Sequence, residues 1–445
     1  MKTYLILLVM SVFLGTEILA VNVSVAQLTI YRLLALGTIP LLIYQLGIKN
    51  KRLVLVANSH ATYALICYVL WWLWAVISVL WAENLLGWLQ AVFLMTIGIA
   101  SIVALYFFVS SFQQWQRLIQ AVWLMISGLV VWGYFEIVTN IYLLADIEKL
   151  DKYRTFDSQP WTRIPITIFS NQNDYATLLL AYLALCLILF NLTRSTWKRL
   201  IYLVMLFASM LLIYQSGSRM ALLCLILFFV VYGLLHLKWN FQPKHYLLIV
   251  SLGLAMVVLV LFLQPNLLMH LLETLRTSTL RGVITGDEAR INLWHNGLMF
   301  LVKSFGFGVG AGNIEYWMEH YAYLFTNDLV NIHNWWLEIL VGYGLVSFVL
   351  YVSAYGLMIY KLLQIMRSKN VFYRPVAKSL VSFMLIFILA SVTSSTNMFI
   401  EWHWVYFGLI ISFIKLVEMQ EGKAANKRLT SQYITINREK IEVIS

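Results

Sequence analysis

A titratable histidine stands where a long polar segment turns into an apolar helix. The stretch 330–340 reads VNIHNWWLEIL, which places His333 beside Asn334. Histidine accepts a proton near neutral pH, which lysine and arginine do not readily do. We therefore predict His333 as a general base that activates a hydroxyl group. The competing interpretation is a histidine that caps a helix or is hydrogen-bonded at the membrane interface.

Two arginines occupy similar boundary positions. Arg219 ends the run SGSR before an apolar helix, and a guanidinium at a helix N-terminus is a good phosphate site. Arg290 lies one turn before Trp294 and is predicted as a second clamp that neutralises a departing diphosphate. The alternatives are a snorkelling arginine at position 219 and, at 290, a residue that faces lipid headgroups or pairs weakly with Asp287 and Glu288.

Weaker candidates lie at the ends of other predicted helices. Arg163, Asn334 and the run 170–174 (SNQND) are predicted to hold substrate groups at the same surface. Arg32 falls inside a predicted span, where a charge is costly and often functional, or it pairs with Glu17 from the preceding span. Two further residues are placed at the same mouth, namely Glu401 and His403.

Four glycines alternate through residues 305–313 (FGFGVGAGN), at positions 306, 308, 310 and 312. No strand–helix unit surrounds them, so they form neither a Walker loop nor a dinucleotide fingerprint. We favour a tightly bent or flexible backbone. The other interpretation is a bare backbone that lets a phosphate or sugar approach closely.

The composition is that of a polytopic membrane protein. Of 445 residues, 61% are hydrophobic and 11% are charged, whereas a soluble domain carries roughly a quarter charged residues. A span needs about 20 apolar residues. We predict an all-α fold of about twelve spans, at 4–20, 27–46, 61–80, 87–110, 118–140, 172–191, 200–215, 220–236, 246–264, 333–361, 378–396 and 403–417.

The charge pattern sets the predicted topology. Basic residues collect in alternate loops, around 49–52, 194–199, 238–244 and 361–378, and in the tail 418–445. The positive-inside rule then places both termini in the cytoplasm. The first apolar run is taken as a retained helix rather than a signal peptide, because the cleavage signal at 24–26 is weak. The three cysteines, Cys67, Cys186 and Cys224, fall inside spans and are predicted to be packing residues.

Two long loops are predicted on the outer side, 141–171 between spans five and six and 265–332 between spans nine and ten. Long ordered loops in a compact body tend to be functional. Within the second loop, 267–280 and 289–300 have the spacing of amphipathic surface helices. We divide the chain into spans one to nine (1–264), this large loop, spans ten to twelve (333–417) and a cytoplasmic tail.

The whole chain resembles the O-antigen ligase and polymerase superfamily of bacterial membrane glycosyltransferases. The resemblance rests on SGSR at 216–219, RINLW at 290–294, the glycine turn, and HNWWLE at 333–338 leading into GYGL at 342–345. These motifs are short, but their order and sidedness are specific. The chain departs from the family at Lys303-Ser304-Phe305, where a proline is usual, and Lys303 becomes a candidate anion contact.

The resemblance implies glycan transfer from an undecaprenyl-diphosphate donor on the outer leaflet, without nucleotide sugar, metal or other cofactor. It implies that Arg219 and Arg290 hold the diphosphate and that His333 is the base on the acceptor hydroxyl. Polymerase activity is favoured slightly over ligation to a lipid A core. A flippase and a chain-length regulator are candidate partners, and nucleic acid is not expected. The competing classes are a lipid-linked oligosaccharide flippase and a structural membrane component.

Overall fold

The computed structural model describes residues 1–15, 20–23, 26–45, 55–144, 147–151, 154–237, 286–392, 398 and 400–442. Apart from a two-stranded antiparallel hairpin of β1 (Val21–Val23) and β2 (Ala26–Leu28), the regular elements in this part of the chain are helices. Eight of these helices are long and apolar enough to cross a membrane. The multi-pass helical architecture is therefore confirmed in outline, while the count of twelve spans stays a prediction.

Most predicted spans correspond to helices of the structure. The eight long helices are α4 (His60–Ile77, extended by a 3-10 turn to Leu80), α5 (Leu85–Phe108), α6 (Phe112–Thr139), α8 (Gln172–Leu192), α9 (Thr196–Gln215), α15 (Trp335–Met366), α16 (Tyr373–Ala390) and the first part of α17 (Trp402–Glu442). Three predicted spans are shorter apolar helices, namely α1 (Lys2–Ser11), α2 (Ile30–Leu36) with α3 (Thr38–Ile43), and α10 (Arg219–Leu234). The predicted span 246–264 and the amphipathic helix 267–280 lie outside the described residues.

Polar capping residues set several helix boundaries. The side chains of Asn84, Ser111 and Ser218 accept hydrogen bonds from backbone amides in the first turns of α5, α6 and α10. Because Ser111 caps α6, this helix begins six residues before the predicted position 118. The last predicted span ends at residue 417, whereas α17 continues through the predicted tail to Glu442, and no proline interrupts it.

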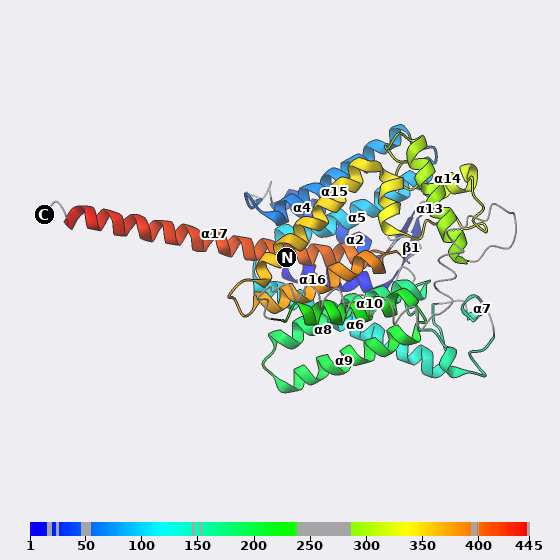
Figure 1. The fold of residues 1–445 in the computed structure, drawn as a ribbon, viewed down its shortest axis with the longest axis horizontal. Coiled ribbons are helices and arrows are strands. Elements are labelled where there is room, and N and C mark those ends of the chain that lie inside the picture. The colour runs from blue at the N-terminus through cyan, green and yellow to red at the C-terminus, as the bar shows by residue number, and fades with distance from the viewer. Residues whose placement is uncertain are drawn as a thin grey trace, which may run out of the picture.

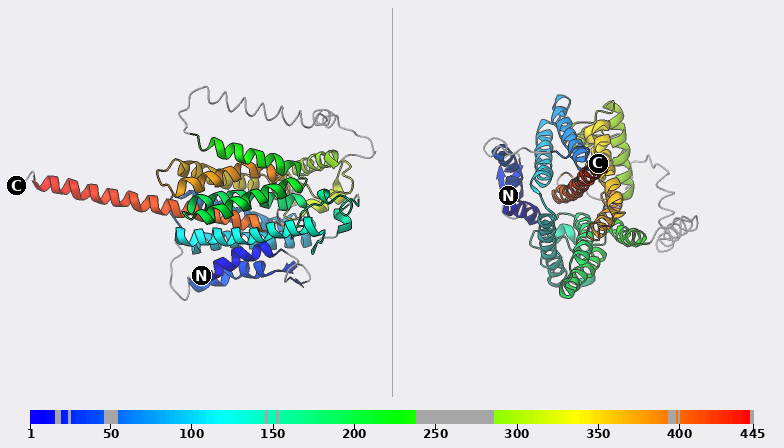
Figure 2. Two further views of the ribbon diagram at one scale, coloured as in Figure 1. Left: turned by 90° about the horizontal axis from the view of Figure 1, so that it is seen from below. Right: turned by 90° about the vertical axis from the view of Figure 1, so that its left-hand side faces the viewer.

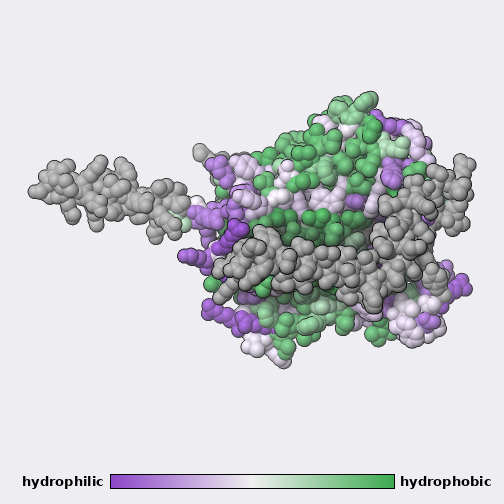
Figure 3. All heavy atoms as spheres, viewed as in Figure 1, coloured by the Kyte–Doolittle hydropathy of each residue, from purple (hydrophilic) through white to green (hydrophobic). Residues whose placement is uncertain are grey.

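Both termini lie at one end of the helical bundle, and the long loops lie at the other (Figures 1 and 2). We call these the terminus end and the loop end; the loop end carries α7 (Ile147–Leu150), α13 (Gly286–Lys303) and α14 (Ile314–Tyr321). Apolar side chains cover the middle of the visible face and polar ones its two ends (Figure 3). This distribution fits a body that spans a bilayer.

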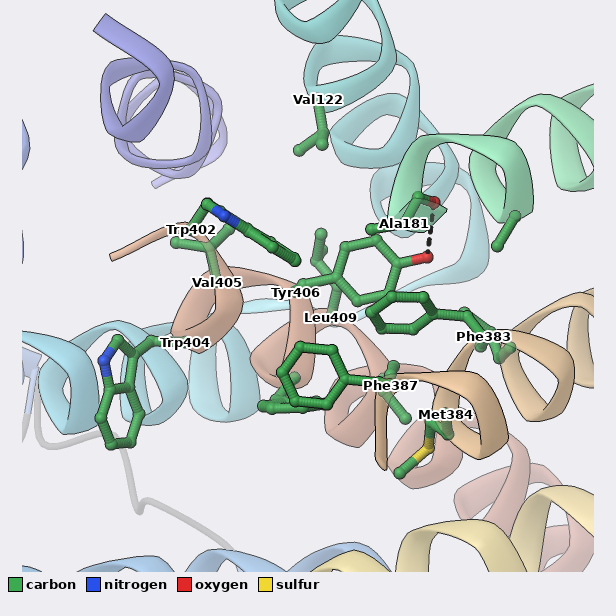
Figure 4. Close-up of a cluster of buried hydrophobic side chains, with 14 of the residues drawn as sticks. Val122, Ala181, Phe383, Met384, Phe387, Trp402, Trp404, Val405, Tyr406 and Leu409 are labelled. Atoms are coloured by element: carbon green, nitrogen blue, oxygen red, sulfur yellow. Dashed lines mark hydrogen bonds between the residues drawn. The ribbon is translucent and has the colours of Figure 1, made fainter. Parts of the chain in front are cut away.

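The core lies around α17, whose membrane-spanning window is 89% buried. This helix packs against α4, α5, α6 and α15, and its aromatic residues form part of a large buried cluster. In Figure 4 the ring of Tyr406 lies between Trp402 and Phe383 of α16, and the Tyr406 hydroxyl donates to the Ala181 carbonyl of α8 at 3.2 Å. The terminal half of α17 leaves this core and projects from the terminus end (Figure 1).

Candidate active site

His333 is held in an unusual backbone conformation just before α15. Its φ of 50° lies in the left-handed region, which a residue with a branched or bulky side chain rarely adopts without a reason. On one side, Asn334 caps α15, since its side-chain oxygen accepts from the amides of Trp336 at 3.1 Å and Leu337 at 3.3 Å. On the other side, the Ile332 carbonyl accepts from the Trp294 indole at 3.0 Å. The surrounding contacts therefore fix the histidine's position.

The structure brings Arg290 close enough to His333 for its charge to act on the imidazole. Arg290 lies four residues before Trp294 on α13 and therefore on the same face of that helix, and Trp294 bonds to the residue next to His333. Burial and the charge of Arg290 lower the pKa of His333 to about 4. The Nδ1 atom of His333 is buried and has no hydrogen-bond partner among the described residues. The site thus holds a neutral imidazole next to a permanent cation.

Arg219 occupies the first position of α10, at the loop end, and its side chain is exposed. Gly217 turns the chain with a φ of 66°, and the Ser218 hydroxyl then caps the helix. The outer part of α16 separates Arg219 from His333: one turn past the arginine, Cys224 contacts the Ile386 carbonyl, and on the other side Trp336 donates to the Ile388 carbonyl at 3.0 Å. Arg219 therefore shares the loop end with His333 but lies one helix away.

The guanidinium of Arg163 is occupied by backbone carbonyls. It donates to Phe156 at 2.9 Å and to Ile137 and Val138 at 2.8 and 2.9 Å, which are carbonyls at the C-terminal end of α6. Arginine commonly satisfies the last carbonyls of a helix in this way. In the neighbouring run 170–174, Asn171 caps α8 through the Asn173 amide at 2.8 Å. Both observations favour a structural role in positioning this loop.

Arg32, which was predicted to lie inside span two and to pair with Glu17 as one alternative, forms its ion pair with a different residue. Arg32 donates from Nε to Glu401 at 2.6 Å and from the guanidinium to the Gln27 carbonyl at 2.6 Å. Residues 26–28 form strand β2 and α2 begins only at Ile30, so Arg32 lies in the first turn at the loop end and not inside a span. Glu17 lies outside the described residues. The placement removes the charge that favoured a transporter.

His403 does not line the mouth of the site. Its ring is buried, and it packs against Trp335 and Trp404 at centroid distances of 5.3 and 4.7 Å. The Nδ1 atom of His403 lies 2.5 Å from the Ile400 carbonyl, so Nδ1 carries the proton. Glu401, the other residue predicted at the mouth, is committed to Arg32. His403 instead packs against the first residue of α15, and Glu401 joins the segment before α17 to α2.

The glycine run 305–313 supplies hydrogen-bond partners for an interruption in helix α15. At Gly344, with φ 82° and ψ 178°, the helix is interrupted. The freed carbonyls of Val341 and Gly342 accept from the amides of residues 309 and 310 at 2.9 and 3.0 Å, and the residue 345 amide donates to the Gly306 carbonyl at 2.9 Å. Unpaired backbone groups inside a bilayer would cost several kcal/mol each. A tightly bent backbone is therefore confirmed.

The bare backbone of this run contacts other parts of the protein. A Cβ added at Gly344 would lie 2.3 Å from the Phe307 carbonyl oxygen, and one at Gly312 would lie 2.2 Å from the Gly87 oxygen. Lys303, at the departure from the family pattern, lies over the rings of Tyr321 and Tyr323 at 5.7 and 4.5 Å. The run therefore docks α13 and α14 onto α5 and α15.

Sequence reasoning missed two carboxylates at the loop end. Glu136, in the last turn of α6, is fully buried and accepts from the amides of Ile166 and Thr167, which holds the loop after α6. Glu338 lies one turn inside α15 and lines a cavity next to His333. The available signal was the same for both, a charged residue inside an apolar helix.

The described residues include no group of three His, Cys, Asp or Glu side chains that could hold a metal ion. The three cysteines are free, two of them buried and Cys67 partly buried, which agrees with a packing role. Around His333, the described residues bring together one histidine, cationic side chains, neutral polar groups and the carboxylate of Glu338. Such a set suits acid–base chemistry on an anionic substrate.

Two comparisons with known proteins show what the chain is similar to. Residues 203–352 match the family model described as O-antigen ligase, a range that contains Arg219, Arg290, His333 and Asn334 but not Arg163. The chain is also 26% identical over 428 residues to the teichuronic acid biosynthesis protein TuaE of Bacillus subtilis (strain 168), covering 92% of this chain and 83% of that protein. Residues 203–352 of this multi-pass membrane protein are thus similar to the O-antigen ligase family, and nearly the whole chain is similar to a protein of teichuronic acid biosynthesis.

Proposed function

We propose that the protein is a metal-independent glycosyltransferase that acts on undecaprenyl-diphosphate-linked glycan at the loop end, on the outer face of the cytoplasmic membrane. The observation that carries this proposal is the pairing of His333 with Arg290 in a part of the structure where the imidazole Nδ1 has no partner. A base beside a cation suits a reaction in which a hydroxyl loses a proton while an anion departs.

In the proposed reaction, His333 takes the proton of an acceptor hydroxyl. The hydroxyl oxygen forms a bond to the anomeric carbon, and the bond from that carbon to the diphosphate oxygen breaks. The diphosphate leaves with the electron pair, and Arg290 stabilises its charge. Arg219 is proposed to hold the same group from the other side of α16. Direct displacement inverts the configuration at the anomeric carbon.

In this arrangement, donor binding also changes the pKa of His333. In the free protein, burial and Arg290 hold the pKa of His333 near 4, so the imidazole is a weak base. An anionic diphosphate next to both residues would offset the arginine's charge and favour the protonated imidazole, which raises its pKa. The base therefore becomes stronger when the donor is in place, which couples proton transfer to a loaded site.

Polymerisation is favoured over transfer to a lipid A core. The described residues of the loop end contain no evident device for recognising such a core, and the relative TuaE is a teichuronic acid biosynthesis protein. A polymerase would receive its substrate from a flippase and would work with a chain-length regulator. We place Asn334 at the site as the cap that orients His333, and Arg163 as a residue that positions the neighbouring loop.

The test is reconstitution of the full chain in lipid vesicles with undecaprenyl-diphosphate-linked glycan extracted from cells that make the polymer. We expect longer or transferred glycan together with released undecaprenyl diphosphate, in EDTA and without nucleotide. Loss of product in EDTA, or dependence on a nucleotide sugar, would contradict the proposal.

Sidedness is tested separately with two single-cysteine variants at exposed positions. Asp328→Cys lies at the loop end and Asn370→Cys at the terminus end. We expect a membrane-impermeant maleimide to label only the first in intact cells, above the background of the unchanged chain. Labelling of only the second would reverse the topology.

A further inference from the structure

A second feature of the loop end is a cavity of about 180 Å³ that the proposed mechanism does not use. We call it the acidic cavity. It lies between the first turns of α5, the start of α14 and the first half of α15, and its lining includes Gln90, Glu315, Asn331, Ile332 and Glu338.

The acidic cavity is continuous with the candidate active site along the chain. Asn331 and Ile332 line it and directly precede His333, and Glu338 lines it from the first turn after Trp335. A group bound in the cavity therefore lies against the same segment that holds the base. The Oδ1 atom of Asn331 is buried and has no hydrogen-bond partner among the described residues. A hydroxyl group bound in the cavity would satisfy this buried acceptor.

The lining is chemically unlike the arginine side of the site. The carboxylates of Glu315 and Glu338 line the cavity together with the amides of Gln90 and Asn331, and the described residues of its lining include no lysine, arginine or histidine. Carboxylate and amide oxygens accept hydrogen bonds from hydroxyl groups. The same two carboxylates disfavour an anion, because like charges at short range cost free energy. The acidic cavity therefore suits a neutral polyhydroxyl group and not a diphosphate.

The size of the cavity limits the occupant. A single water needs only about 10–15 Å³ of such volume, so the space is far larger than a water site. It is smaller than the roughly 300–1,000 Å³ of pockets that enclose drug-sized ligands. A single sugar ring fits this range, whereas a longer glycan would have to extend out of the cavity.

We propose that the acidic cavity binds one uncharged sugar ring of the acceptor and presents its hydroxyl to His333. This proposal rests on the proposed function and adds to it the place and the charge class of the acceptor. The acceptor and the donor diphosphate would then bind on opposite sides of His333, one against carboxylates and the other against arginines. The sugar that accepts the glycan is accordingly not a uronic acid.

The first test separates acceptor use from donor use. Full-length protein in vesicles receives the undecaprenyl-diphosphate-linked glycan, and two products are measured: transferred glycan, and undecaprenyl diphosphate released when water replaces the sugar acceptor. For Glu315→Gln and Gln90→Ala we expect transfer to fall about tenfold or more, as for loss of a hydrogen bond to a bound ligand, with release by water unchanged.

Matched controls lie on the same helices outside the cavity. Glu319→Gln is one turn further along α14, and Leu89→Ala is the exposed neighbour of Gln90; both should transfer normally. If transfer and water release fell together in the cavity variants, or if neither changed, the acceptor assignment would be wrong. Wild-type protein that gives neither product would refute the proposed function itself, so the two failures are distinguishable.

The second test addresses charge. Pairs of methyl glycosides of gluco, galacto and manno configuration, each as hexoside and as uronide, are added as competing acceptors. We expect at least one hexoside to inhibit transfer more strongly than its uronide, and Glu315→Lys to narrow that difference. A uronide that competes as well as its hexoside, or a complete lack of competition by the hexosides, would overturn the assignment.

Discussion

Charged side chains at the two ends of the bundle differ in whether they have partners within the protein. At the terminus end, Glu418 accepts from His60 at 2.8 Å, Lys361 pairs with Glu421 at 2.8 Å, and Lys415 donates to the Val109 carbonyl at 2.7 Å. At the loop end, Arg290 forms no ion pair with any described residue, and its charge instead acts on His333. Paired charges at one end fasten helices, whereas the unpaired cation and base at the other are available to a substrate.

The loop end also contains its own counterexample. Arg32 and Glu401 form a buried ion pair there, with side chains 6% and 11% exposed. Position at the loop end is therefore not enough to make an arginine functional. The distinction that matters is between an arginine whose donors are already occupied, as in Arg32 and Arg163, and one whose donors are left for an anionic ligand.

The largest expected effect comes from removing the base. His333→Asn keeps the left-handed backbone, which asparagine tolerates, and removes the titratable ring. We expect transfer to fall by about 10²- to 10⁴-fold, as for loss of a general base. The matched control is His60→Asn at the terminus end, which should keep normal transfer. If His333→Asn retained a tenth or more of wild-type transfer, His333 would not be the general base, and the two ends would not differ in this respect.

The arginines come next. We expect Arg290→Gln to lower kcat/KM for the donor by about 10²- to 10³-fold, as for loss of one preorganised charge-stabilising donor. Arg219→Gln should cost about tenfold, because its side chain is exposed and lies across α16. Arg199→Gln, which removes a guanidinium bonded to the Thr193 carbonyl, serves as the terminus-end control. A larger loss at position 219 than at 290 would reverse the assigned roles.

The paired arginine should affect stability instead. Arg32→Met leaves Glu401 buried without its cation, and we expect unfolding to become easier by about 3 kcal/mol. The double variant Arg32→Met with Glu401→Leu should recover most of this loss, and the folded fraction should transfer normally. By contrast, Lys361→Met should cost less than about 1 kcal/mol, because Glu421 is half exposed.

The stability of the three variants (Arg32→Met, its double variant with Glu401→Leu, and Lys361→Met) is measured by thermal unfolding, with all proteins in one detergent. Equal destabilisation in the single Arg32 variant and in the double variant would show that the ion pair is not the source of the effect. A loss of transfer in folded Arg32→Met protein would place this arginine in the active site after all.

Hydropathy and charge predicted many of the helices, but not the contacts between segments that are far apart in the sequence. The predicted span 172–191 agrees closely with α8 (Gln172–Leu192), because a helix in lipid must be apolar over its whole length. The break at Gly344 could not be predicted in the same way, since its carbonyls and amide are satisfied by residues 306–310. Likewise, Arg32 and Glu401 are 369 residues apart, and no local pattern links them.

The candidate site was partly predictable. His333 and Arg290 were placed at one surface by charge pattern and by resemblance, and the structure brings them together. The structural use of Arg163 was missed, because which helix end a loop arginine meets depends on how the loop folds back. The acidic cavity was missed for a related reason, since α5, α14 and α15 come together only in the folded protein.

The smallest expected effect is a shift in pH dependence, and it sharpens the comparison most. A base must be neutral to act, and the lowered pKa of His333 keeps it neutral down to about pH 4 in the free protein. The profile of kcat/KM should therefore be flat below neutral pH and fall only near 4, whereas an ordinary histidine would give a fall near 6.5. In kcat, which reports the loaded site, the fall should occur at a higher pH because the donor's charge favours the imidazolium ion.

Arg290→Gln separates the two causes of the lowered pKa. Burial is the larger cause and remains in the variant, while the arginine's charge is removed. The acidic limb of kcat/KM should therefore move above 4 but stay below 6.5, and His60→Asn should leave it in place. An acidic limb at 6.5 in the unchanged protein would mean that His333 is solvated and unopposed by Arg290. In that case the pKa of His333 would be that of an exposed histidine, and Arg290 alone would distinguish the charged groups of the loop end from the paired ones of the terminus end.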